Sequence, residues 1–196
     1  MLPIEEGMKE MNDKKEINTL LHQEKQNADQ ILHASWVTTP LSEMLIIADE
    51  NYLYLLEFIS RKDLEKEITK LQTKFSAHIV EGETRISKQI TAELDAYFKG
   101  ELTAFKTPFK LLGTSFQQQV WQALCTIPYG ETISYKTLAD KVGNPTGFRA
   151  VANANGKNQL AIIVPCHRVI NHNGKLGGYG GGLDKKEKLL QLESRV

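Results

Sequence analysis

The residues most able to do chemistry lie together at Cys166, His167 and Arg168, directly after Pro165. Proline restricts its own φ and favours an extended Val164, so the cysteine would leave an apolar run at a stiff position. A neighbouring histidine or arginine favours the thiolate, which is the nucleophilic form of cysteine. The segment therefore predicts a reactive thiol, although a lone cysteine is more often a buried structural residue.

The only other cysteine is Cys125, in a predicted helix that also carries Val120 and Leu124, and there a structural role is favoured. Two widely separated cysteines fit no zinc-binding spacing, so we expect no metal site. No glycine motif for a nucleotide is visible, so we expect no cofactor. A chain of 196 residues with so few cysteines favours free thiols in a reducing compartment.

The elements that must position this thiol fall into two predicted domains. Residues 1–30 are polar and predict a mobile tail or a loosely held helix. Residues 31–104 predict a small domain with an antiparallel meander followed by two helices, and 105–113 a linker. The expected strands lie at 34–38, 44–48 and 52–58, and the helices at 64–75, with Asp63 as N-cap, and 86–98, closed by Gly100.

Residues 114–196 predict a mostly helical second domain. Thr114 or Ser115 would cap one helix and Ser134 the next, and a third would run over 147–155. The two helices around Gly143 predict a helix-turn-helix. A buried strand at 160–164, a glycine-rich loop at 171–182 and a helix at 185–193 would follow. The expected fold class is α/β (α+β).

Net charge is zero, but it is divided unevenly. Residues 1–113 carry 14 Lys and Arg against 19 Asp and Glu, whereas residues 114–196 carry 10 against 5. A basic second half is compatible with an anionic partner. No signal peptide or long apolar stretch is visible, so we expect no membrane association and a cytoplasmic location, or a nuclear one in a eukaryote.

Several separated blocks resemble, in order, the O6-alkylguanine-DNA alkyltransferases, also called methylated-DNA–protein-cysteine methyltransferases. The resemblance is dense over 114–193 and looser before it. It implies a ribonuclease H-like first domain and a second domain like a winged helix-turn-helix. The blocks are Phe116–Trp121, Ile127–Thr132, Ser134–Tyr135, Gly143–Pro145, Arg149–Val151, Pro165–Val169 and Gly177–Tyr179.

The resemblance also implies the chemistry. Cys166 would accept the alkyl group of O6-alkylguanine, and of O4-alkylthymine as a further substrate. His167 would take the thiol proton through a water, and Glu193 would orient His167. Asn158 would brace the turn that carries the cysteine, and Tyr135 would donate a proton to the purine. A thioether has no easy route back to a thiol, so each molecule would act once.

The implied partner is double-stranded DNA containing the alkylated base, bound by a monomer that flips the nucleotide out. Arg149 would be the finger that fills the vacated space. The other expected DNA contacts are Tyr135, Ala150, Ala152, Lys157 and Arg168, with Lys136, Lys141 and Lys175 as plausible phosphate contacts, and the pocket would be lined by Val164, Pro165, Tyr179, Gly180 and Gly181.

Two of these features have a second interpretation. The small residues after Arg149, including Ala154 and Gly156, could serve helix packing, and the glycine loop could be a flexible linker. Many family members have serine where this chain has Gly180, which predicts tolerance of alkyl groups larger than methyl.

Two other functions remain as alternatives. A protein that binds alkylated bases without repairing them would lack the acceptor cysteine, which is present here. A cysteine hydrolase would have to use adjacent nucleophile and base residues, whose side chains diverge. An intact-mass measurement after incubation with alkylated DNA separates all three.

Overall fold

The structure is a computed structural model that describes residues 4–21, 28 and 30–194, in two compact units. Unit 1 is Met1–Leu94 with Thr107–Lys110, and unit 2 is Asp95–Lys106 with Leu111–Val196. The division differs from the expected boundaries because it falls inside helix α3 (Arg85–Phe98). The expected linker is also divided: within it, Phe109 forms a bridge with Leu53 and so extends the sheet of unit 1.

Unit 1 contains a four-stranded sheet in the order β3-β2-β1-β4. The strands are β1 (Gln30–Thr38), β2 (Glu43–Ala48), β3 (Leu53–Phe58) and β4 (Ala77–Glu81). β1, β2 and β3 pair antiparallel, as the sequence predicts, and β4 adds to β1 in parallel. We did not predict β4 because its five residues mix polar and apolar types without a long alternation.

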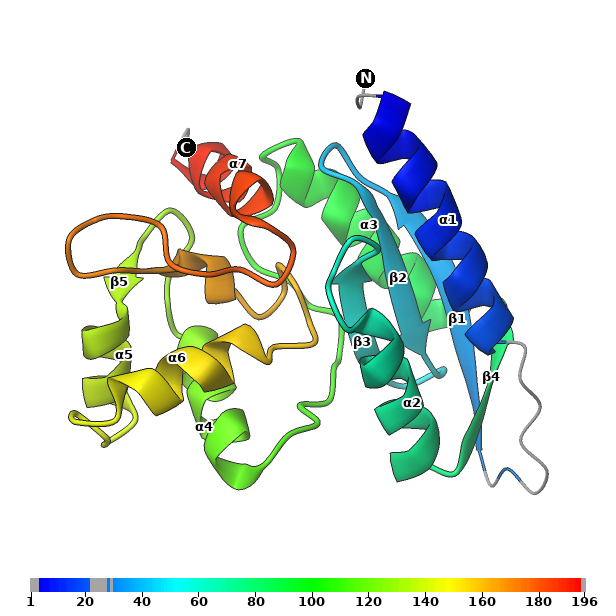
Figure 1. Ribbon diagram of the computed structural model, residues 1–196, viewed down its shortest axis with the longest axis horizontal. Helices are drawn as coiled ribbons and strands as arrows, with labels where there is room; N and C mark the ends of the chain where they lie inside the picture. The colour runs from blue at the N-terminus through cyan, green and yellow to red at the C-terminus, as the bar shows by residue number, and fades with distance from the viewer. Residues whose placement is uncertain (1–3, 22–27, 29, 195–196) are drawn as a thin grey trace. The chain divides into compact units, whose positions relative to one another are not determined.

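The N-terminal segment contains a helix, α1 (Ile4–Leu21), which runs beside the sheet of unit 1 (Figure 1). Ile17 and Leu21 are buried, and Lys14 forms an ion pair with Glu43 and lies 4.9 Å from the centre of the Trp36 ring. Of the two expectations for residues 1–30, the helix is therefore what the structure shows. Residues 1–3, 22–27 and 29 of this segment, and 195–196 at the other end, lie outside the described residues.

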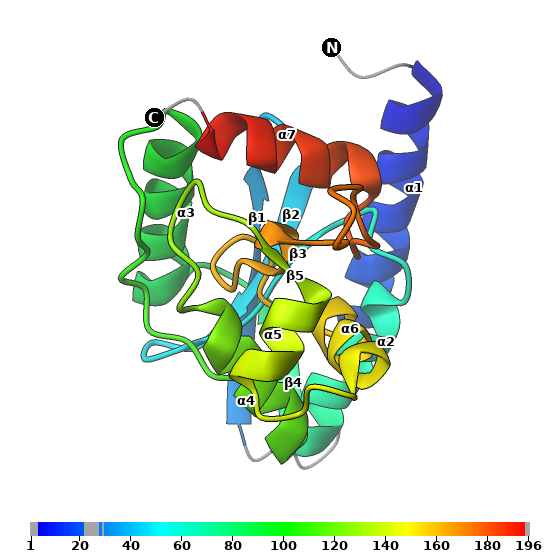
Figure 2. The same cartoon turned by 90° about the vertical axis from the view of Figure 1, so that its left-hand side faces the viewer.

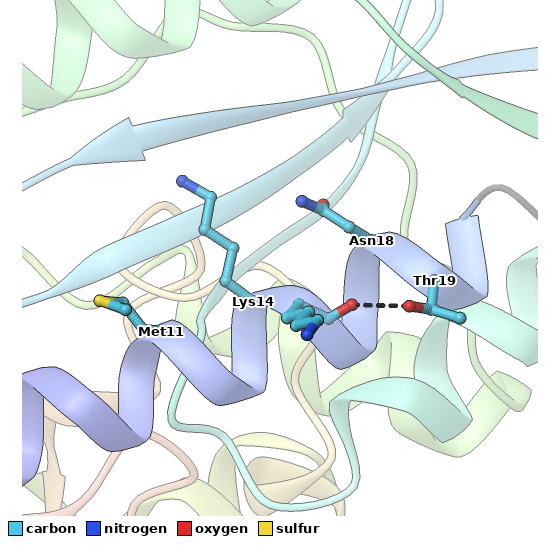
Figure 3. Close-up of a pocket in the computed structure, with 5 residues that line it drawn as sticks. Met11, Lys14, Asn18 and Thr19 are labelled. Atoms are coloured by element: carbon cyan, nitrogen blue, oxygen red, sulfur yellow. Dashed lines mark hydrogen bonds between the residues drawn. The ribbon is translucent and has the colours of Figure 1, made fainter.

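A hollow of about 580 Å³ borders α1 (Figure 3). It is lined by Met11, Lys14, Lys15, Asn18 and Thr19, and the Thr19 hydroxyl donates to the Lys15 carbonyl at 2.9 Å. This hollow contains none of the residues expected to do chemistry.

Two helices complete unit 1, α2 (Leu64–Lys74) and the first part of α3. Most of the apolar positions predicted for these helices are buried, as at Ile68 and Ile90, whereas Phe75 and Phe98 are half-buried. Asp63 precedes α2 but is not a side-chain cap, because its φ of 66° is left-handed and its carboxylate bonds to Lys66 instead. Gly100 follows α3 at a φ of 76°, which glycine adopts at low cost.

Unit 2 contains three helices that pack on one another, α4 (Ser115–Leu124), α5 (Tyr135–Lys141) and α6 (Phe148–Gly156) (Figure 2). Thr114 caps α4 in a capping box with Gln117, and Ser134 caps α5. The indole of Trp121 donates to the Ala154 carbonyl at 2.8 Å, which fixes α4 against α6.

The rest of unit 2 holds the reactive segment. It comprises β5 (Ile133–Ser134), the short helix η1 (Cys166–Arg168), β6 (Val169–Ile170) and α7 (Leu183–Glu193). Residues 160–164 are buried as expected but form a turn and not a strand. Over the described part of the chain, no helix is both long and apolar enough to cross a membrane.

Candidate active site

A two-stranded parallel ribbon brings the chemistry-bearing segments together. β5 pairs with β6, with Ile133 beside Val169 and Ser134 beside Ile170. η1 ends where β6 begins, and α5 begins where β5 ends. The pairing therefore places Cys166 and Tyr135 on neighbouring segments, although they are far apart in the sequence.

The turn before Cys166 is buried and strained. Ile162 has a φ of 71°, which is rare for a β-branched residue, and it is 1% exposed. Such strain persists only where the surroundings hold it, and it is frequent at functional sites. The contacts that hold this strained residue thus override the local preference of an apolar run for a strand.

Asn158 holds this turn from inside. Its amide nitrogen donates to the carbonyls of Leu160 and Val164, at 3.2 and 2.8 Å, and lies 3.2 Å from Cys166 Sγ. Its amide oxygen accepts from the Leu160 N–H at 3.0 Å. One side chain therefore touches both ends of the turn and the sulfur.

His167 and Glu193 form a buried pair, with Nε2 of the imidazole 2.8 Å from Oε1 of the carboxylate. His167 Nδ1 is buried and has no hydrogen-bond partner among the described residues. Burial lowers the pKa of His167, which opposes protonation, although Glu193 acts in the other direction. His167 is therefore neutral near pH 7, with one ring nitrogen held and the other available.

Glu193 is held by more than the histidine. Arg168 donates to both of its oxygens, Nε at 2.8 Å and the terminal nitrogen at 3.0 Å. The Tyr97 hydroxyl donates at 2.7 Å and the Gly130 N–H at 3.3 Å. Burial opposes ionisation of Glu193, but the hydrogen bonds from His167, Arg168 and Tyr97 outweigh it and lower its pKa to about 2.

These contacts correct the expectation that Arg168 binds DNA. The side chain is 6% exposed, and its remaining terminal nitrogen donates to the Ile127 carbonyl at 2.6 Å. A guanidinium whose donors are used inside the protein cannot reach a phosphate. Arg168 instead stabilises the charged Glu193.

Tyr135 and Lys186 lie beside the thiol. Burial raises the pKa of Tyr135, and the negative charge of the Cys166 thiolate raises it further. Burial lowers the pKa of Lys186 to about 8, although the same negative charge acts in the opposite direction. Lys186 is fully buried and donates to the carbonyls of Val169 and Gly177, at 2.6 and 3.3 Å. It therefore ties the strand after Cys166 to the glycine loop.

The glycine loop must approach Tyr135 closely. A Cβ at Gly177 would lie 2.6 Å from the Tyr135 ring, so no other residue fits there without displacing the tyrosine. The Tyr135 hydroxyl lies 3.5 Å from the Gly178 carbonyl. The loop is thus a fitted wall of the site and differs from a flexible linker.

A cavity of about 1490 Å³ opens beside this group. Among the described residues that line it, none is Asp or Glu, whereas Lys136 and Arg149 contribute positive charge. Of the predicted pocket residues, Tyr179 and Gly180 line it, whereas Val164, Pro165 and Gly181 are buried and do not. Tyr135, Arg149 and Ala152, which were expected to contact DNA, also line it. The charge of the lining favours an anionic partner.

Helix α6 presents its residues differently along its length. Arg149, Ala150 and the following Lys157 are exposed, and Ala152 is half-buried. Ala154 is 3% exposed and packs under Trp121, so for this residue the helix-packing interpretation holds. The small residues therefore do not form one continuous outer face.

The sequence interpretation missed Tyr97 and Lys186. Tyr97 offers no signal, since it continues the apolar spacing of Ile90 and Leu94 in α3. Lys186 lies in a run of charged residues that is typical of a solvated helix. Its spacing from Leu189 and Glu193 places all three on the buried face of α7, and this was the available signal.

Two family models match this chain. One, described as 6-O-methylguanine DNA methyltransferase, DNA binding domain, matches residues 115–195, and the other, the ribonuclease-like domain of the same family, matches 32–111. A methylated-DNA–protein-cysteine methyltransferase from Methanosarcina barkeri is 41% identical over 158 residues, which are 80% of this chain and 94% of that protein. The chain belongs to this family.

Another methyltransferase of the family is more similar to this chain, over a shorter stretch. The Mycobacterium bovis protein of the same name is 61% identical over 101 residues, 52% of this chain and 61% of its own length. The chain thus matches less than two thirds of that relative. A crystal structure of Mycobacterium tuberculosis OGT in complex with DNA has a TM-score of 0.72 at 41% identity, covering 83% of this chain and 92% of that one.

Membership in this family confirms the resemblance seen in the sequence and agrees with the expected α/β fold. The model of the family's DNA binding domain covers residues 115–195, which include Cys166, His167 and Glu193. Among the described residues, no three His, Cys, Asp or Glu side chains are grouped so that they could hold a metal ion.

Proposed function

We propose that this chain repairs DNA by transferring the alkyl group of O6-alkylguanine to Cys166. The observation that carries the proposal is the buried pair of Glu193 and His167, the residue directly after Cys166 in the chain, together with a nearby cavity whose described lining holds no carboxylate. The relative from M. tuberculosis was crystallised with DNA, which supports the same partner here.

The first step is removal of the thiol proton. When His167 donates Nε2–H to Glu193, a lone pair remains on Nδ1, the nitrogen without a hydrogen-bond partner. This nitrogen accepts the proton of Cys166 through a water molecule, and Glu193 stabilises the imidazolium that forms. The positive charge of buried Lys186 favours the thiolate while this lysine is protonated, which is below about pH 8.

The second step is an in-line displacement at the alkyl carbon. A sulfur lone pair forms the S–C bond, and the C–O6 bond breaks with its electron pair moving to the guanine oxygen. Tyr135, whose pKa is raised by burial, is protonated at neutral pH and donates its proton to the purine as negative charge develops there. The proton that His167 took from Cys166 then returns to the tyrosinate through water. The products are guanine and a thioether at Cys166, so each molecule reacts once and no cofactor is consumed.

The target base must leave the duplex to reach a thiol that is 6% exposed. We propose that α5 and α6 act as a helix-turn-helix, that exposed Arg149 fills the space left by the base, and that Ala150, Ala152 and Lys157 face the DNA. A helix with small residues can approach the minor groove closely. O4-alkylthymine is a second substrate that the same pocket would accept.

An intact-mass measurement tests the proposal. After incubation with a duplex containing one O6-methylguanine, we expect a single methyl-sized gain that is absent in Cys166→Ala. An unchanged mass with tight binding would contradict transfer and favour a damage sensor. Repeated turnover of an ester or amide would instead indicate a hydrolase.

The alkyl-size range is tested by Gly180→Ser. Gly180 lines the cavity, and a serine there would add atoms to the wall. We expect the wild-type chain to accept benzyl as well as methyl adducts, and Gly180→Ser to slow benzyl transfer more than methyl transfer. Complete failure of the wild type with a benzyl adduct would contradict this expectation.

A further inference from the structure

An exposed aromatic residue stands next to Arg149. Phe148 is the first residue of α6, is 49% exposed and lines the same cavity as Tyr135 and Tyr179. Among the described residues, the other large apolar side chains that are exposed, such as Ile31 and Leu183, do not line this cavity. Leaving a phenylalanine in water forgoes the gain from its burial, so an occupant that covers it would be stabilising.

Phe148 and Arg149 form a paired group. The Arg149 guanidinium lies 5.9 Å from the centre of the Phe148 ring, at the outer limit of a cation–π contact. The arginine can replace hydrogen bonds of a missing base, whereas the phenyl ring can only replace stacking. The two side chains therefore offer the two interactions that a flipped nucleotide removes from a duplex.

We infer that Phe148 is a second wedge: its ring stacks on the base pair beside the flipped nucleotide while Arg149 occupies the vacated space. Proteins that open the minor groove often insert such apolar side chains between base steps. The positive charge and the lack of carboxylates in the described lining fit DNA as the occupant. This inference rests on the proposed function and assigns Phe148 a positioning role in it.

The test compares single-turnover transfer from a duplex containing one O6-methylguanine with transfer from the same strand without its complement. The single strand has no base-pair stack to reseal, so it does not need a wedge. We expect Phe148→Ala to slow the duplex reaction about tenfold, since loss of an aromatic stacking platform costs that much or more. The single-strand rate should change less than about twofold, and Phe148→Trp should restore the duplex rate.

Ile31→Ala is the matched control, because Ile31 is 58% exposed and belongs to unit 1. Unchanged melting temperatures of the variants exclude unfolding as the cause. Equal duplex rates for wild type and Phe148→Ala, or equal slowing on both substrates, would overturn the inference. Absence of transfer by the wild type on either substrate would instead overturn the proposed function.

A second readout stays informative without transfer. A 2-aminopurine base placed beside the lesion changes its fluorescence when its stacking changes. Binding of Cys166→Ala should change this signal, and binding of the double variant with Phe148→Ala should leave it near that of free duplex. The same signal with and without Phe148 would count against the wedge.

Discussion

Glu57 in unit 1 and Glu193 in unit 2 are both buried beside an arginine, yet their pKa values shift in opposite directions. Burial raises the pKa of Glu57 to about 7, although Arg61 lowers it in part. Glu193 accepts from His167, Arg168, Tyr97 and Gly130, and its pKa falls to about 2. A buried carboxylate thus stays charged only when several donors replace the water it has lost.

The difference separates the pair of Glu57 and Arg61 in unit 1 from the pair of His167 and Glu193, which we propose to be functional. Near pH 7 Glu57 is partly protonated, and its pair with Arg61 serves the sheet of unit 1. Glu193 remains charged under all ordinary conditions, so it can hold the imidazole in one orientation and stabilise its protonated form. What distinguishes Glu193 from Glu57 is the number of hydrogen-bond donors around the carboxylate, since both carboxylates are buried.

The largest expected contrast comes from neutralising each glutamate. In Glu193→Gln the buried Arg168 loses its counter-charge, and we expect unit 2 to lose about 3–5 kcal/mol of unfolding free energy. Loss of the oriented base should also slow transfer to Cys166 at least about 100-fold. In Glu57→Gln an amide oxygen still accepts from Arg61, so we expect a loss of about 1–2 kcal/mol in unit 1 and an unchanged transfer rate.

The two tryptophans of the chain allow the unfolding free energy of each unit to be measured separately. Trp36 lies in β1 of unit 1 and Trp121 in α4 of unit 2. Urea unfolding followed by fluorescence in single-tryptophan backgrounds reports each unit separately. Equal losses in the two units would contradict the proposed difference between the glutamates.

The pH dependence should also differ in sign. Glu57 binds its proton more tightly in the folded state than at the ordinary value of 4.5, so unit 1 should gain stability as pH falls from 7 to 4.5. Glu193 has the reverse order: its contribution is present above pH 4.5 and is lost as pH falls toward 2. Each change should be about 3 kcal/mol at most.

In Glu57→Gln, the unfolding free energy of unit 1 should change little between pH 7 and 4.5. In Glu193→Gln, that of unit 2 should change little between pH 4.5 and 2. Urea unfolding of the single-tryptophan variants across pH 2–7 checks both, within the range where each unit still folds. A Glu193→Gln chain with the same acid sensitivity as wild type would contradict a pKa near 2 for Glu193.

Part of this site could be predicted from the sequence and part could not. Cys166 and His167 were expected because one short motif carries them, and Glu193 because the family resemblance implies it; the structure brings His167 and Glu193 together. The packing around them could not be predicted: Arg168 was expected to contact DNA because the partner of a basic residue beside a nucleophile is not visible in a sequence. The strand β4 and the turn at Ile162 were missed because tertiary contacts override their local patterns.

Tyr97 is the clearest case of a contact that no local pattern encodes, since it lies 96 positions from Glu193 in the sequence. Tyr97→Phe keeps the buried ring and removes only the hydroxyl that donates to Glu193. We expect it to destabilise unit 2 by about 1.5–3 kcal/mol, the range for a hydrogen bond to a charged group. It should also raise the pKa of Glu193, so unit 2 should begin to lose stability at a higher pH when the solution is acidified.

Tyr129→Phe is the matched control for this change. The Tyr129 hydroxyl is buried without a hydrogen-bond partner among the described residues, and its ring lies 6.0 Å from that of Tyr97. Removing a hydroxyl that forms no bond should leave stability equal or slightly higher. If the two variants lose the same free energy in urea unfolding, ring packing and not the hydroxyl of Tyr97 stabilises this region, and the count of donors around Glu193 would no longer explain its low pKa.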